Sequence, residues 1–143
     1  MTIHRSGSAH WTGGLKDGHG RISTQSGALA DYPYGFQSRF EGVAGSNPEE
    51  LLAAAHAACF TMALSLILGE AGLTAESLDT KARVALEQTP DGFAIPSVEL
   101  QLSAKIPGTD DATFQKLAGT AKANCPVSKL FKAEISLVAV LVE

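Results

Sequence analysis

Two cysteines are the residues of this sequence best suited to chemistry. Cys59 lies in an alanine-rich run, and Cys125 lies between Asn124 and Pro126. A thiolate can attack the O–O bond of a peroxide, and two thiols that pair in a chain without an export signal are expected to do so transiently, as part of a reaction. The simpler alternative for Cys59 is an inert core thiol, since cysteine is among the most buried residue types.

Local sequence favours Cys125 as the more acidic of the two thiols. Pro126 follows it and indicates a short helical turn that begins there, so its sulfur is expected near a helix N-terminus, where a thiolate is favoured. Cys59 lies many residues from the start of its own helix and gains little from the helix dipole. Cys59 therefore needs a cation beside it to act as a nucleophile.

His56 precedes Cys59 by three residues and lies near the same helical face. This spacing allows a Cys–His activated pair, or a metal site that also includes Cys125. A buried, hydrogen-bonded histidine is the commoner alternative. The other three histidines lack metal-ligand spacing, so no metal site is expected.

The helix that positions Cys59 has the strongest local signal in the chain. Asn47 is expected as the N-cap and Pro48 as the first helical residue, with Glu49 and Glu50 in the first turn, where Glu50 could close a capping box. Gly72 is placed to end the helix in a left-handed turn. A long helix is therefore predicted between these two signals.

The stretch Leu51–Leu68 contains no Asp, Glu, Lys or Arg and approaches the length of a membrane span. It also contains His56, Thr61 and Ser65 and many alanines, which favour a helix buried inside protein. Apolar residues surround this helix on all sides, so we expect it to be central.

The remaining segments predict strands and a second helix. Three short strands are expected at Ala9–Thr12, Gly20–Gln25 and Phe36–Glu41, and three longer ones at Leu78–Gln88, Val98–Ile106 and Glu134–Val142. Thr109 or Asp110 should open the second helix, and Val127–Lys132 could form a further helical turn. This order indicates an α+β fold with antiparallel sheets wrapped around a long buried central helix, in a single domain over residues 1–143.

Composition narrows the classes of partner. The chain has 143 residues, 45% of them hydrophobic, a formal net charge of -4 and no basic cluster, so nucleic acid and anionic membranes are poor partners. The amino end lacks the basic stretch and apolar run of an export signal, which predicts a cytoplasmic protein.

Three motifs, in this order, together resemble the OsmC/Ohr family of hydroperoxide reductases: Gly45–Leu51, Ala57–Phe60 and Asn124–Lys129. The segments Arg39–Gly42 and Leu64–Gly72 are closer to the osmotically inducible OsmC branch. The resemblance covers nearly the whole chain and implies an intertwined α+β homodimer with two sites at the interface.

The resemblance also implies a two-cysteine peroxidase cycle and reverses the ranking of the thiols. Cys59 becomes the nucleophile that reduces an organic hydroperoxide, and hydrogen peroxide as well, to the alcohol or water. Cys125 then resolves the sulfenic acid as a disulfide, which an external dithiol such as a lipoyl group reduces. No bound cofactor is expected, and the implied role is defence against oxidative or osmotic stress.

The family pairs an arginine with a glutamate near the reactive sulfur, which here implies Arg39 and Glu49. Arg39 would stabilise the thiolate and orient the peroxide, while Glu49 holds the guanidinium; the alternative is a surface ion pair of little weight. Glu49 and Cys59 are about 15 Å apart along one helix. A site that uses both must therefore be built by two chains.

Four apolar side chains are candidates for substrate binding: Phe36, Phe40, Phe60 and Met62. They could line an approach to Cys59 that favours alkyl hydroperoxides, although a core role is as plausible for each. A rival function is a non-catalytic, stress-related dimer that binds a small hydrophobic ligand and whose cysteines are inert.

Overall fold

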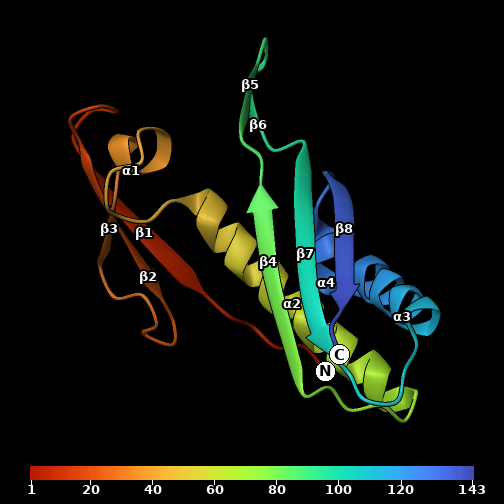
Figure 1. Ribbon diagram of the computed structural model, residues 1–143. Coiled ribbons are helices and arrows are strands. Elements are labelled where there is room, and N and C mark those ends of the chain that lie inside the picture. The colour runs from red at the N-terminus through yellow and green to blue at the C-terminus, as the bar shows by residue number, and fades with distance from the viewer. The chain divides into compact units, whose positions relative to one another are not determined.

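The computed structural model describes all 143 residues, and the chain divides into two compact units, Met1–Leu51 and Leu52–Glu143 (Figure 1). The first unit contains β1 (Gly7–Thr12), β2 (His19–Thr24), β3 (Tyr32–Tyr34), α1 (Phe36–Phe40) and the beginning of α2 (Pro48–Glu70). The second contains the rest of α2, then β4 (Ser77–Val84), β5 (Glu87–Thr89), β6 (Gly92–Ala94), β7 (Ser97–Lys105), α3 (Asp111–Asn124), α4 (Pro126–Leu130) and β8 (Glu134–Leu141). The single-domain interpretation of the sequence stays a prediction.

The first unit is built on an antiparallel sheet in the order β1-β2-β3. Trp11 of β1 and Tyr34 of β3 flank Gly20 of β2, and their rings meet edge to face with centroids 5.5 Å apart. A Cβ atom at Gly20 would collide with both rings, so glycine is required for the close approach.

The strand predicted at Phe36–Glu41 is wrong, because Phe36–Phe40 form helix α1 and Glu41 is its C-cap. The Ser38 hydroxyl accepts a hydrogen bond from the Gly35 N–H at 2.9 Å, which turns the chain into a helical entry. The rings of Phe36 and Phe40 then meet one helical turn apart, with centroids 4.9 Å apart. The third strand lies just before this helix, at the sheet edge where Pro33 is tolerated.

The second unit contains a sheet in the order β4-β7-β8 and a small hairpin of β5 and β6. β4 and β7 pair antiparallel, as predicted, whereas β7 and β8 pair parallel. The parallel pairing follows from the connection, since α3 and α4 carry the chain back to the end of the sheet at which β7 begins. Asp110 caps α3 by accepting a hydrogen bond from the Thr113 N–H at 2.7 Å, as expected.

Helix α2 begins and ends where the sequence predicts. The Asn47 side chain accepts a hydrogen bond from the Glu50 N–H at 2.8 Å, and Gly72 adopts a φ of 75° just past the last turn. The expected capping box is not formed. Glu50 instead accepts a hydrogen bond from the Ser46 hydroxyl at 2.9 Å, which gives its carboxylate a charge-assisted partner.

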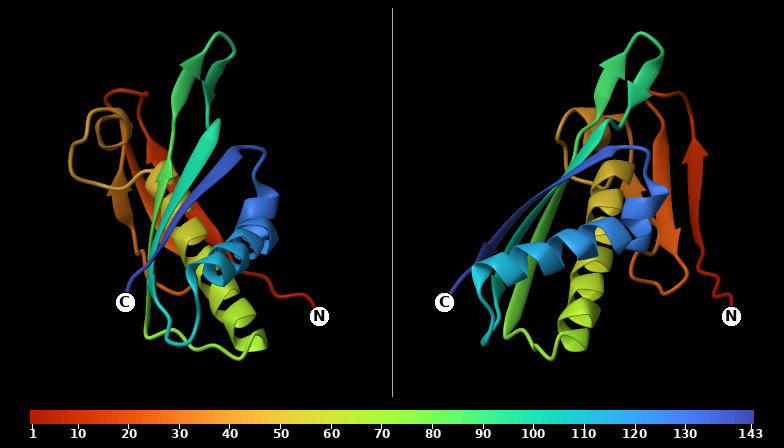
Figure 2. Two further views of the ribbon diagram at one scale, coloured as in Figure 1. Left: turned by 45° about the vertical axis from the view of Figure 1, so that its right-hand side comes forward. Right: turned by 90° about the vertical axis from the view of Figure 1, so that its right-hand side faces the viewer.

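α2 is the long central helix of the second unit, and one of its faces is buried. Phe60, Leu64 and Leu68 pack with residues of β7 and α3 in one apolar core, on the side of the sheet where both helices lie (Figure 2). Met62 and Leu66 are 77% and 65% exposed. By length and composition alone α2 could cross a membrane, a test that the core helix of a soluble protein also passes.

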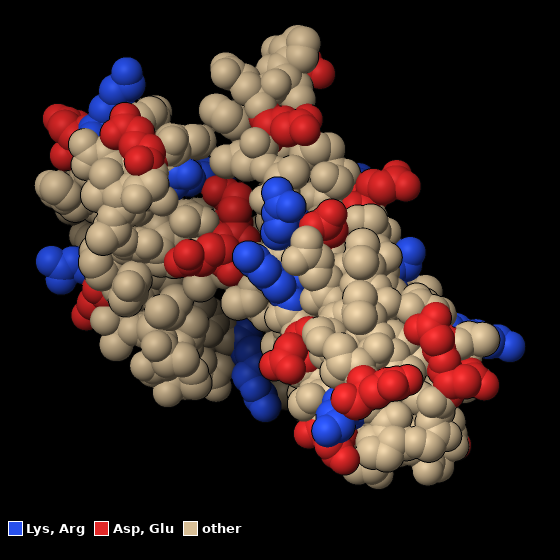
Figure 3. All heavy atoms as spheres, viewed as in Figure 1, with Lys and Arg blue, Asp and Glu red and all other residues tan.

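The outer face of the β4-β7-β8 sheet carries charges of both signs. Asp79, Lys81 and Lys105 are exposed there. The Nη1 atom of Arg83 lies 3.5 Å from the Oε1 atom of Glu99. In Figure 3 the basic and acidic atoms over this sheet are interspersed, with no continuous basic area on the face shown. Such a surface offers little that would attract a polyanion.

Candidate active site

The structure brings the two cysteines together in the second unit. Cys59 is half-buried on α2, and Cys125 is fully buried between the end of α3 and the start of α4. Both thiols are free, and their side chains share a hydrogen bond. The side chains of two residues from distant parts of the chain therefore lie next to each other.

The surroundings of the two sulfurs act on their pKa values in opposite directions and favour the thiolate form of Cys125 over that of Cys59. Burial raises the pKa of Cys59, and the hydrogen bond with Cys125 raises it further. Burial acts in the same direction on Cys125. Its pKa is nevertheless lowered below the ordinary value, because its thiolate is stabilised by the hydrogen bond from Cys59, by the N–H and hydroxyl of Ser128 and by the Val127 N–H. Cys125 is the more acidic thiol, as its place before a helical turn predicted.

The first turn of α4 supplies the groups that stabilise the Cys125 thiolate. Cys125 is the N-cap, Pro126 follows as the first helical residue, and Val127 and Ser128 present their N–H groups towards the sulfur. The sulfur makes no complete capping hydrogen bond, but these donors still favour its charged form. No arginine or lysine contributes to the pKa of either thiol.

His56 does not pair with Cys59, which removes the Cys–His alternative. Its Nε2 atom lies 2.7 Å from the Ser128 Oγ, and its Nδ1 atom is buried without a partner. The ring packs edge to face against Phe131, with centroids 5.3 Å apart. Burial lowers the pKa of His56, so the imidazole is neutral near pH 7.

In the first unit, the predicted arginine and glutamate form a forked ion pair. Arg39 of α1 donates from Nε to Glu49 Oε1 at 2.9 Å and from Nη2 to Oε2 at 3.1 Å. The Arg39 side chain is 36% exposed and that of Glu49 11%. The guanidinium also lies over the Phe40 ring, 5.2 Å from its centroid. The second guanidinium edge stays available for another anion, because the Glu49 fork occupies only one.

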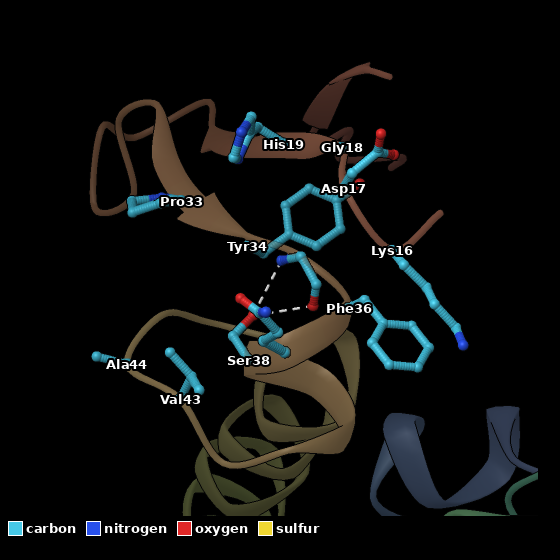
Figure 4. Close-up of a pocket in the computed structure, with 12 residues that line it drawn as sticks. Lys16, Asp17, Gly18, His19, Pro33, Tyr34, Phe36, Ser38, Val43 and Ala44 are labelled. Atoms are coloured by element: carbon cyan, nitrogen blue, oxygen red, sulfur yellow. Dashed lines mark hydrogen bonds between the residues drawn. The ribbon is translucent and has the colours of Figure 1, made fainter. Parts of the chain in front are cut away.

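The four candidate substrate residues lie in different surroundings. Phe36 lines a cavity of about 370 Å³ in the first unit, beside Lys16 and Tyr34 (Figure 4), and the Lys16 amine lies 5.8 Å from the centroid of its ring. Phe60 is fully buried in the core of the second unit, and Met62 is exposed on α2. Within that unit, Phe60 is packed as a core residue and Met62 is open to a ligand or a partner.

The chain contains no group of three or more His, Cys, Asp or Glu side chains arranged to hold a metal ion. In particular, the side chain of His56 is directed to Ser128 rather than to the two sulfurs.

Ser128 and Val127 belong to the thiol site and were missed in the sequence. The signal that could have found them is the order Cys-Pro-Val-Ser, which places a serine at the third position of the helical turn that Cys125 caps. At that position both the N–H and the side chain reach back to the cap residue.

Comparisons with known proteins identify the family. A sequence model described as "OsmC-like protein" matches residues 41–139. The chain is 56% identical to "Peroxiredoxin OsmC" of Escherichia coli over 137 residues, 96% of each chain. It is 35% identical over 94 residues, 65% of this chain and 64% of the other, to the "Organic hydroperoxide resistance protein" of Xanthomonas axonopodis pv. citri.

A solved structure agrees with both matches. The organic hydroperoxide resistance protein OhrB of Bacillus subtilis superposes with a TM-score of 0.68 at 26% identity, covering 96% of this chain and 98% of that one. The chain belongs to the OsmC-like family.

Proposed function

We propose that this protein is a peroxiredoxin-like hydroperoxide reductase that uses Cys59 as nucleophile and Cys125 as resolving thiol. The observation that carries the proposal is the hydrogen-bonded pair of free thiols at the junction of α2 and α4. The names of its relatives, a peroxiredoxin and organic hydroperoxide resistance proteins, support an organic hydroperoxide as substrate.

In the first step, the Cys59 thiolate attacks the terminal oxygen of the hydroperoxide. An S–O bond forms, the O–O bond breaks, and the alkoxide leaves and takes up a proton to become the alcohol. Cys59 is the more exposed of the two sulfurs, which suits it to meet a substrate. Cys125 is fully buried, which suits it to the later, internal step.

In the second step, Cys125 attacks the sulfur of the Cys59 sulfenic acid. An S–S bond forms, the S–O bond breaks, and hydroxide leaves and becomes water. An external dithiol then reduces the disulfide, and its two thiols become a disulfide in turn. A lipoyl-type dithiol fits this need, and no bound cofactor is required.

Cys59 requires a cation that its own unit does not supply. Burial and the neighbouring Cys125 raise its pKa, so the attacking thiolate must be stabilised by another group. Arg39 is the candidate, because its fork with Glu49 leaves donors for the thiolate and for the peroxide oxygens. Glu49 and Cys59 are separated by about 15 Å of helical rise, which supports an Arg39–Glu49 pair contributed by a second chain.

The apolar surface of a single chain supports a homodimer. Every buried hydrophobic side chain of the core belongs to the second unit, from Phe60 onward, and the first unit buries none. α2 leaves Met62 and Leu66 exposed although its sequence is apolar on all sides. A second copy that covers this face would complete the core, in a soluble cytoplasmic dimer with a role in oxidative or osmotic stress.

The test is peroxide consumption with cumene hydroperoxide and dihydrolipoamide, together with intact mass. The protein should form one Cys59–Cys125 disulfide after stoichiometric peroxide, and Cys125→Ser should accumulate oxidised Cys59. Cys59→Ser should lose turnover. Full turnover of Cys59→Ser, or unreactive thiols in the unmodified protein, would contradict the proposal and favour the non-catalytic ligand-binding alternative.

A further inference from the structure

His56 is a fully buried polar side chain that the two-cysteine cycle leaves without a role. Its Nε2 atom is 2.7 Å from the Ser128 Oγ, across 72 positions of sequence, and its Nδ1 atom has no partner. A buried polar atom without a hydrogen bond costs free energy and is rare in native proteins. An apolar residue in this place would avoid that cost, so the buried imidazole points to a role for its other nitrogen.

The unpartnered Nδ1 indicates which nitrogen carries the hydrogen. The ring is neutral because burial lowers the pKa of His56, so one nitrogen is a donor and the other an acceptor. An orphaned N–H donor is rarer in proteins than an acceptor with an unused lone pair. Hydrogen on Nε2 is therefore favoured, and His56 donates to the Ser128 oxygen.

Ser128 has a single hydroxyl hydrogen, and the Cys125 sulfur is positioned to receive it. Ser128 is the third residue of the helical turn that Cys125 caps, and its hydroxyl contributes to stabilising the Cys125 thiolate. The side chain is nearly buried, at 8% exposure, so water competes little for the hydroxyl. When the Ser128 oxygen accepts a hydrogen bond from His56, the Ser128 hydroxyl hydrogen is free to point at the Cys125 sulfur.

We propose that His56 is a positioning residue for the resolving thiol, in a directed chain of hydrogen bonds from His56 Nε2–H to Ser128 Oγ–H to the Cys125 sulfur. This rests on the proposed function, in which Cys125 attacks the Cys59 sulfenic acid. The chain keeps Cys125 in the thiolate form that this attack needs, and hydroxide from Cys59 leaves as water after taking up a proton. His56 touches no reacting atom and acts through Ser128.

The first test measures the ionisation of Cys125 without any peroxide. In a Cys59→Ser background only one thiol remains, and its thiolate is followed by ultraviolet absorbance as a function of pH. Ser128→Ala should raise the pKa of Cys125 by about one, the effect of losing one hydrogen bond to a charged group. His56→Phe, which keeps the ring shape, should raise it by less, and His56→Gln, whose amide N–H can still donate, should stay near the parent value.

A matched control removes a different hydroxyl from the same unit. Thr61 of α2 and Thr80 of β4 share a hydrogen bond between hydroxyls at 2.7 Å, the same separation as His56 and Ser128. Thr80→Val should leave the pKa of Cys125 unchanged. A rise in this control equal to that in Ser128→Ala would show a general loss of packing and would overturn the inference.

The second test measures resolution in proteins with both cysteines. At a pH below the pKa of Cys125, Ser128→Ala should slow disulfide formation after one addition of peroxide by about threefold, because there the thiolate fraction falls about tenfold while the intrinsic nucleophilicity rises about threefold. Sulfinic acid at Cys59 should increase in the mass spectrum, since the sulfenic acid persists longer. His56→Phe should also slow disulfide formation and increase the sulfinic acid at Cys59, but by less than Ser128→Ala.

The two proposals fail in distinguishable ways. An unchanged pKa of Cys125 in both Ser128→Ala and His56→Phe would overturn the role of His56 and leave the peroxidase intact, whereas a parent protein without a peroxide-induced disulfide would refute the cycle itself. If His56→Phe does not fold, the nitrogen chemical shifts of His56 in the unmodified protein decide the matter. Hydrogen on Nδ1 would contradict the directed chain.

Discussion

The thiol pair of the second unit and the arginine–glutamate pair of the first unit hold their charges in different ways. In the thiol pair, N–H and hydroxyl donors lower the pKa of Cys125, and no cation contributes to the pKa of either cysteine. Arg39 and Glu49 neutralise each other through a fork whose arginine is partly exposed. The thiol pair contains hydrogen-bond donors and lacks a cation. The arginine–glutamate pair contains a cation and lacks a thiol.

This difference bears on the proposed roles of the two cysteines. Within its own unit, Cys125 is the more acidic thiol, so a single chain favours the thiolate form of the cysteine that is proposed to resolve the sulfenic acid. Attack by Cys59 becomes favourable when a guanidinium lies beside it. In the proposed cycle, the Arg39–Glu49 pair therefore decides which cysteine reacts first.

The largest effect should follow from removing the Arg39 cation. Arg39→Met should lower kcat/KM for an alkyl hydroperoxide by about a hundredfold or more, as loss of a preorganised donor does in other enzymes. Arg83→Met is the matched control, because Arg83 forms an exposed ion pair with Glu99 on the outer sheet face. It should retain activity within about twofold, as expected for a surface pair.

Dimers of two different variants test whether Arg39 and Cys59 act together from separate chains. If the site forms between two chains, co-refolding chains that carry Arg39→Met with chains that carry Cys59→Ser should restore activity that neither variant is expected to have alone. Each mixed dimer then has one site with an intact Arg39 from one chain and an intact Cys59 from the other. No recovery, in a preparation that mass analysis shows to contain mixed dimers, would mean that both groups act within one chain.

Glu49→Gln should have a smaller effect, because the guanidinium stays but loses its charged anchor. We expect roughly a tenfold loss of kcat/KM, the order expected for one hydrogen bond between charged groups. Glu50→Gln is the neighbouring control, since Glu50 bonds to Ser46 instead of Arg39. Equal losses in both variants would indicate damage to the start of α2 rather than to the arginine.

Stability should fall as the solution is acidified, because of His56. Its pKa is lowered by burial, so below the ordinary value of 6.5 the unfolded chain binds a proton that the folded chain does not. Unfolding then takes up protons, and the free energy of unfolding decreases as pH drops below about 6.5. His56→Phe should remove this part of the slope in denaturant titrations, and an unchanged slope would show that the pKa of His56 is the same in the folded and unfolded states.

The smallest effect concerns the start of α2. Asn47→Ala removes the cap that accepts from the Glu50 N–H and should lower the free energy of unfolding by about 1 kcal/mol. Chemical denaturation with an unchanged m-value would measure it. Activity of the folded enzyme should stay near normal, and a loss as large as that of Glu49→Gln would mean that the cap also sets the position of the arginine pair.

The sequence predicted helix ends correctly where they depend on interactions between neighbouring residues. Asn47, Gly72 and Asp110 cap or end helices as predicted, because capping depends on a few neighbouring residues. The segment Phe36–Glu41 misled, because its aromatic residues favour strand while Ser38 bonds back to Gly35 and starts a helix. The parallel pairing of β7 and β8 depends on the path of α3, which the strand pattern does not encode.

The sequence by itself determined the two thiols, the acidity expected of Cys125, the long apolar helix and the resemblance to the OsmC/Ohr family, since these depend on residue type, spacing and ordered motifs. Only the tertiary structure decided that Cys59 meets Cys125, that Arg39 forks onto Glu49, and that His56 turns from Cys59 to Ser128. The physical reason is that hydrogen bonds act over about 3 Å, and the partners in these contacts come from different elements whose packing brings them within that range.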